Sequence, residues 1–204
     1  MTLTNLKKAA MFGLDARIAL AIFGALSVIS GAALYSAIQQ AKVTAIIAQM
    51  NEVGKAWEQL YLDTGRELPI YESSPYLLKV NEFLEDIGTP GWNGPYLSLE
   101  SNADWRLLAP GGSGYSSIEF RVATGDTTWL VADSPGVTGK NSECKAGVQC
   151  NLWIRVFGLS ESLVTAIDER IDGTVGKTTG NLRAQDGSGN PIYYKYANIT
   201  NPFN

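Results

Sequence analysis

The residue types that could do chemistry are the first constraint on function. The chain of 204 residues contains no histidine and two cysteines. Without an imidazole there is no histidine general base, no Ser-His or Cys-His nucleophile pair and no histidine metal ligand. Two cysteines are too few for a four-thiolate zinc or iron–sulfur site. The remaining carboxylates, hydroxyls and lysines form no recognisable catalytic pattern, so we expect a protein that is not an enzyme and requires no cofactor.

Acidic side chains near the C-terminus are candidate metal ligands. Asp168 and Asp172 lie in an acidic stretch, and Asp186 lies in a glycine-rich turn. Calcium takes several oxygen ligands from carboxylates and loop carbonyls. These three residues are therefore candidate calcium ligands, although EF-hand spacing is absent. The alternative is that Asp168 is a solvated helix residue and that the Asp-Gly pairs are ordinary turns.

An uncharged apolar run dominates the N-terminal part. No charged residue lies between Ile18 and Ala41, and a membrane span needs roughly 20 predominantly apolar residues. Lys7 and Lys8 precede the run, which predicts a cytoplasmic N-terminus with the remainder across the membrane. The net charge is −4, and the acidity lies beyond Lys42. A net negative charge argues against nucleic-acid binding.

Three interpretations of this run compete. A cleaved secretory signal would have a shorter apolar core, followed by a small-residue cleavage site. A simple single-span anchor is the second interpretation. The third interpretation uses a detail that the other two leave unexplained, namely that Asp15 and Arg17 lie just before the run. A carboxylate at the membrane edge is costly without a partner, which makes Asp15 a functional candidate.

The helical pattern continues beyond the apolar run. Apolar residues recur at spacings of three and four, the stripe of an amphipathic helix, at Val43, Ile46, Ile47, Met50, Val53, Trp57, Leu60 and Tyr61. Gly65 and Pro69 supply the stop signal. The pattern predicts a helix from about Met11 to Asp63. Its second half packs against a globular domain, and its first half must be buried in lipid or among other copies of itself.

The globular half is β-rich. Short runs bounded by turn residues predict strands, namely Tyr96–Leu99, Trp105–Leu108, Ser117–Ala123, Thr127–Ala132 and Leu152–Phe157. Within Ser117–Ala123, apolar residues alternate with Glu119 and Arg121, the pattern of a half-buried strand. Gly125-Asp126 predicts a hairpin turn. A short helix capped by Ser160 and a last hairpin from Leu182 to Ala197 complete the prediction.

The two cysteines lie in one loop of this half. Cys144 and Cys150 are six positions apart. The compartment across the membrane is oxidising, so a disulfide is favoured. Two free thiols are the alternative.

The N-terminal residues resemble a type IV pilin-like protein and are most similar to the major pseudopilins of type II secretion systems. Members of this family have a short basic leader, a cleavage site, an acidic residue at mature position five and an apolar helix. Here the leader is residues 1–10, and cleavage between Ala10 and Met11 puts Asp15 in fifth place. The family usually has Gly, Phe and Glu where this chain has Ala10, Met11 and Asp15. A cut after Gly13 would lose the carboxylate from that place.

A role for Asp15 follows from physics as well. Among packed apolar helices a lone carboxylate needs a cation. The free α-amino group at Met11 of a neighbouring subunit would supply one and would set the register between copies, as buried polar groups do in coiled coils. Arg17 is the competing partner, and the alternative is that Asp15 is a solvated flank of a membrane helix.

A second segment is similar to the W-x-G-P-Y segment of major pseudopilins. It comprises Trp92, Gly94, Pro95 and Tyr96 within the run Gly91–Leu97. Turn-forming residues flank the aromatic side chains of Trp92 and Tyr96, which can hold the loop in place by packing. We expect an irregular loop that packs on the long helix, and no binding site.

The prediction is an α+β fold of the pilin type, with a long N-terminal helix packed on a C-terminal antiparallel sheet. Its parts are leader 1–10, protruding apolar helix 11–41 and globular domain 42–204. The resemblance implies a filament subunit of a type IV pilus or secretion pseudopilus, with identical subunits, a prepilin peptidase and assembly platform proteins as partners. It implies insertion in the inner membrane before assembly, a periplasmic or extracellular filament afterwards, and calcium in a C-terminal loop. The alternative is a monomeric, membrane-anchored periplasmic binding domain.

Overall fold

The computed structural model describes residues 3–125, 142–185 and 189–203, with only the backbone for residues 3–12 and 14. The chain forms two compact units, residues 1–41 and 42–204. The predicted strand Thr127–Ala132, Asp126 of the predicted turn and the candidate ligand Asp186 lie outside the described residues.

Helix α1 (Leu3–Thr64) begins earlier than the predicted start at Met11 and ends where the sequence predicts. No proline interrupts it. Gly65 follows with a φ of 68°, a left-handed conformation that favours glycine. Its N–H donates to the Tyr61 carbonyl at 2.8 Å, which satisfies one of the carbonyls left free at a helix end.

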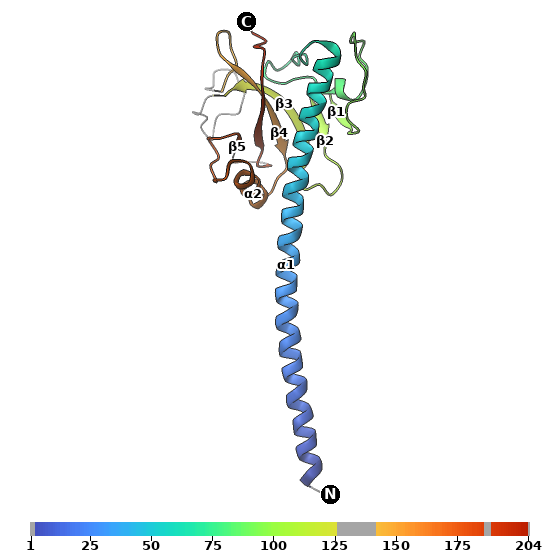
Figure 1. Cartoon of the computed structure of the whole chain (residues 1–204), viewed down its shortest axis with the longest axis vertical. Helices are drawn as coiled ribbons and strands as arrows, with labels where there is room; N and C mark the ends of the chain where they lie inside the picture. The colour runs from blue at the N-terminus through green and yellow to red at the C-terminus, as the bar shows by residue number, and fades with distance from the viewer. Residues whose placement is uncertain (1–2, 126–141, 186–188, 204) are drawn as a thin grey trace. The chain divides into compact units, whose positions relative to one another are not determined.

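The 42–204 unit is built on an antiparallel sheet. The described strands form a six-stranded sheet in the order β1-β2-β3-β4-β6-β5 (Figure 1). They are β1 (Ser101–Ala103), β2 (Arg106–Leu108), β3 (Ser117–Thr124), β4 (Cys150–Phe157), β5 (Leu182–Ala184) and β6 (Ile192–Ile199). A 3₁₀ helix, η1 (Asn81–Phe83), and helix α2 (Glu161–Asp172) complete the described elements. The predicted α+β class is confirmed.

The apolar stripe of α1 enters the core of this unit. Ile46, Met50 and Leu60 are at most 1% exposed. They belong to one buried cluster with the inward-facing residues of the central strands, among them Ile118, Phe120, Val122, Leu152, Ile154 and Val156. Successive side chains of a strand point to opposite faces of the sheet, so these alternate residues all lie on the same face. Burial of this face therefore holds residues 42–64 of α1 on the sheet.

Gly54 is required where α1 meets β6. A Cβ at this position would overlap the ring of Tyr196. We expect Gly54→Ala to destabilise the unit by about 1–3 kcal/mol, the usual cost of overpacking. Gly31→Ala, where no atom lies near the added Cβ, is the control and should cost nothing. Urea denaturation of the full chain in detergent measures both, and equal midpoints for the two variants would contradict the contact.

Two strand predictions need correction. Tyr96–Leu99 is not a strand, because the N–H groups of Tyr96 and Leu97 both donate to the carbonyl of Phe83 instead of to a sheet partner. Strand β1 was not predicted; its residues, Ser101–Ala103, carry little apolar pattern. The predicted last hairpin is confirmed in that β5 and β6 pair antiparallel. Helix α2 is also confirmed, with the Ser160 hydroxyl accepting the Leu163 N–H.

Candidate functional site: an exposed apolar helix and its supporting contacts

The N-terminal half of α1 presents apolar side chains on all sides. Between Ile18 and Ile38 the large apolar side chains are 46% to 73% exposed. This is one helix of sufficient length and hydropathy to cross a membrane. Full burial of one such side chain contributes about 1.5–3 kcal/mol. The segment therefore requires lipid or protein around it.

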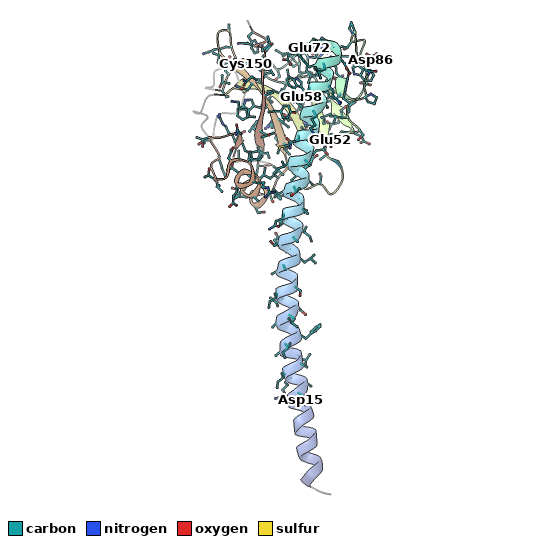
Figure 2. All side chains as sticks on the ribbon, in the orientation of Figure 1. Asp15, Glu52, Glu58, Glu72, Asp86 and Cys150 are labelled. Carbon is teal, nitrogen blue, oxygen red and sulfur yellow. A yellow bond between two sulfur atoms is a disulfide. The ribbon has the colours of Figure 1, made fainter. Side chains whose placement is uncertain are left out.

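The two charged residues near the start of this segment, Asp15 and Arg17, are both exposed, and no ion pair joins them in the described part of the chain. Figure 2 labels Asp15 on this part of α1. Ala10 and Met11 lie within the helical backbone of α1, so the predicted cleavage position falls inside this helix. No partner within the described chain competes for the Asp15 carboxylate. An external cation is free to pair with it.

The Trp-Asn-Gly-Pro-Tyr segment packs where α1 ends. The Tyr96 hydroxyl donates to Oδ2 of Asp63 at 2.9 Å, and Trp92 Nε1 donates to the Glu82 carbonyl at 2.8 Å. The two rings meet edge to face with centroids 5.8 Å apart. The Gly94–Pro95 peptide is cis. These contacts fix the segment to the end of α1 and to η1.

A buried carboxylate reinforces this junction. The Glu82 side chain is fully buried, and Arg66 Nη2 donates to its Oε2 at 2.8 Å. The same Nη2 atom donates to the Thr89 hydroxyl at 2.6 Å. A buried charge needs a charged, hydrogen-bonded partner. This pair ties the segment after α1 to the loop that carries the aromatic motif.

Glu67 joins the end of α1 to the C-terminal segment and makes stability depend on pH. Its carboxylate accepts from Trp57 Nε1 at 3.0 Å and from the backbone of Thr200. Burial, the dominant effect, raises the pKa of this carboxyl above its ordinary value. Between the unfolded and the folded pKa the native state binds more protons, so stability rises as pH falls through the folded pKa.

We therefore expect Glu67→Gln to be more stable than the wild type at pH 7, because the amide keeps an acceptor for Trp57 without the buried charge. The advantage should shrink as the pH falls toward 4. Thermal denaturation across this pH range measures it. A difference that does not change with pH would contradict the assignment to Glu67.

The candidate calcium ligands Asp168 and Asp172 lie one turn apart on α2 and hold the loop that follows. Oδ2 of Asp168 accepts the Gly176 N–H at 2.6 Å, and Asp172 accepts the N–H groups of Asn181 and Leu182 at 3.0 and 2.8 Å. Asp168 is 3% exposed, so the alternative of a solvated residue is wrong. Its Oδ1 has no hydrogen-bond partner among the described residues, and burial raises the pKa of its carboxyl.

No group of three potential ligands gathers around a common point in the described residues. The carboxylates of Asp168 and Asp172 instead act as hydrogen-bond acceptors for the backbone. The third candidate, Asp186, lies outside the described residues.

The cysteines form the predicted disulfide. Cys144 and Cys150 are bonded, with Cα atoms 5.6 Å apart. The Asn201 side chain donates to the carbonyls of Lys145 and Val148 within the loop that the disulfide closes. The disulfide therefore closes the loop before β4, and the Asn201 side chain joins this loop to the C-terminal segment.

A charged cluster that the sequence does not reveal lies on the sheet face away from α1. Glu119 is fully buried, and its carboxylate accepts from Arg106, Arg121 and Arg155 at 3.1–3.3 Å. Each guanidinium also lies over an aromatic ring, Arg155 at 3.4 Å from the Phe157 centroid. Burial lowers the pKa of Arg155. All of β3 is buried, so the predicted half-buried strand is wrong.

The physical reason is that β2 and β4 flank β3 and carry arginines opposite Glu119. Arg155 pairs directly across from Glu119 in the β3–β4 register, and Arg106 comes from β2. Alternation along β3 alone does not show this. The nearest signal in the sequence is a single arginine in each of the two neighbouring strands, Arg106 in β2 and Arg155 in β4.

Comparison of the chain with protein-family models, with curated proteins and with solved structures gives no match.

Proposed function

We propose that the chain is a structural subunit of a filament, of the type IV pilus or type II secretion pseudopilus kind. The observation that carries the proposal is the exposed apolar half of α1, which bears one carboxylate near its start. The 42–64 half of the same helix is buried on a folded domain. A helix that is apolar on all sides is stable only in lipid or in protein. A bundle of identical helices buries it without a further partner.

Asp15 would select the register of this bundle. Cleavage between Ala10 and Met11 creates an α-amino group, and Asp15 has no cation bound to it in the described chain. In the low dielectric of packed helices, pairing with the amino group of a neighbour offsets the cost of burying the carboxylate. Wrong registers would leave the charge unpaired. The inner membrane holds the subunit before assembly in this proposal.

Intact-mass analysis of membrane-extracted protein tests the processing step. The proposal expects a species that lacks residues 1–10, beginning at Met11. A species that keeps residues 1–10 in cells with an active prepilin peptidase would favour the membrane-anchored monomer instead. Coexpression with and without the peptidase provides the control.

Calcium binding stays a prediction, and thermal denaturation tests it. If Asp168 and Asp172 bind calcium, millimolar calcium chloride should raise the melting temperature of the wild type and not that of Asp172→Asn. Magnesium at equal concentration is the control, because it demands a tighter octahedral site. Equal shifts for both proteins would show that calcium does not bind there.

A further inference from the structure

A hollow in the 42–204 unit is open to occupation. It has a volume of about 380 Å³, and its apolar lining includes Pro75, Tyr76, Val122 and Phe203. Such a volume lies in the range of pockets that take small ligands, roughly 300–1,000 Å³. It is therefore large enough for an apolar side chain from outside.

One charged group beside the hollow is available for pairing. Lys145 lines the hollow and is exposed, and in the described part of the chain its amino group forms no ion pair. Glu143 also lines the hollow and has a partner of its own. The hollow therefore combines an apolar wall with an available cation.

A protruding apolar side chain lies elsewhere on the same unit. Leu62 is 80% exposed at the end of α1, although its neighbour Leu60 is fully buried. Asp63 follows it, is exposed, and accepts only the Tyr96 hydroxyl in the described residues. An apolar tip beside a carboxylate matches an apolar hollow beside an amino group.

The two surfaces are separate. A second, more polar hollow lies at Leu62, lined by Gln59, Asp63, Asn93, Pro95 and Tyr96, and it shares no lining residue with the first. A protrusion on one surface that fits a hollow on another makes a contact between unlike surfaces. Such a contact leaves both outer surfaces free, and it continues as an open helical array when the rotation between copies does not close a ring.

We propose that Leu62 of one subunit inserts into the hollow at Tyr76 and Phe203 of a second copy, where Asp63 pairs with Lys145. The inference depends on the proposed function, because it assigns a contact between the folded units of the filament. Leu62 supplies apolar burial, and the Asp63–Lys145 pair supplies orientation more than affinity.

Filament yield from cells that express the full chain tests the proposal. Leu62→Glu should lower the yield of sheared filaments at least tenfold. Ala146→Trp, which fills the hollow from an exposed lining position, should do the same. The control is Val175→Glu, a change of the same kind at another exposed apolar residue, which should leave the yield unchanged. Melting temperatures of the purified chains in detergent establish that all three variants fold.

Charge reversal provides an independent test of the same contact. Asp63→Lys and Lys145→Asp should each lower the yield, and the double variant should restore it. A bismaleimide should join Leu62→Cys to Ala146→Cys only when the two variants are mixed in one filament. If the folded Leu62→Glu and Ala146→Trp variants assemble at the wild-type yield, the contact is wrong and the filament proposal stands. If the wild type forms no filament, both fail.

Discussion

Asp15→Ala is expected to abolish filament assembly and to leave the fold of the 42–204 unit unchanged. Asp15 is exposed and forms no ion pair in the described chain, so its loss removes no contact from the folded unit. In the bundle, removal of the carboxylate leaves the amino group of Met11 in a neighbour buried and unpaired. Breaking a buried ion pair in this way costs about 3–5 kcal/mol.

The measurement combines filament yield with the melting temperature of the purified chain. Asp15→Glu keeps the carboxylate and should assemble. Arg17→Gln separates the two candidate partners, since it abolishes assembly only if a neighbouring Arg17, and not the amino group of Met11, binds Asp15. Normal filaments from Asp15→Ala would show that the carboxylate does not set the register.

Glu119→Gln should produce the largest loss of stability in the 42–204 unit. The Glu119 carboxylate is the shared acceptor of Arg106, Arg121 and Arg155, and its side chain is fully buried. Arginine stays charged in proteins, so the variant leaves guanidinium groups in the interior without that carboxylate. The expected cost is about 3–5 kcal/mol in the free energy of unfolding.

Urea denaturation of the full chain in detergent measures this loss. Glu58→Gln is the matched control, because Glu58 is exposed and bonds only the Tyr196 hydroxyl in the described residues. Surface changes of this kind usually stay within about 0.5 kcal/mol. A Glu119→Gln midpoint equal to that of the control would show that the cluster contributes little to stability.

Local sequence patterns predicted those elements that depend only on residues close together in the chain. The spacing of Val43, Ile46 and Met50 predicted the buried stripe of α1, and Gly65 predicted its end. Alternation predicted β3, and Ser160 predicted the start of α2. Each of these signals depends on the identity of residues within one or two turns of the chain.

The features that the sequence missed depend on contacts between distant segments. Glu119 has the alternation of a solvent-facing residue, yet arginines from β2 and β4 bury it. Tyr96 has strand-like neighbours, yet its N–H donates to Phe83 because the motif packs on η1. Asp168 has the spacing of a solvated helix residue, yet the loop after α2 covers it. No pattern within a single element reports such partners.

Electron microscopy of sheared material from cells that express the full chain together with a prepilin peptidase tests the central proposal most directly. We expect thin helical filaments whose subunits begin at Met11 by mass and whose cores consist of packed α1 helices. Membranes that contain only monomeric, unprocessed chain under every assembly condition would contradict the proposal.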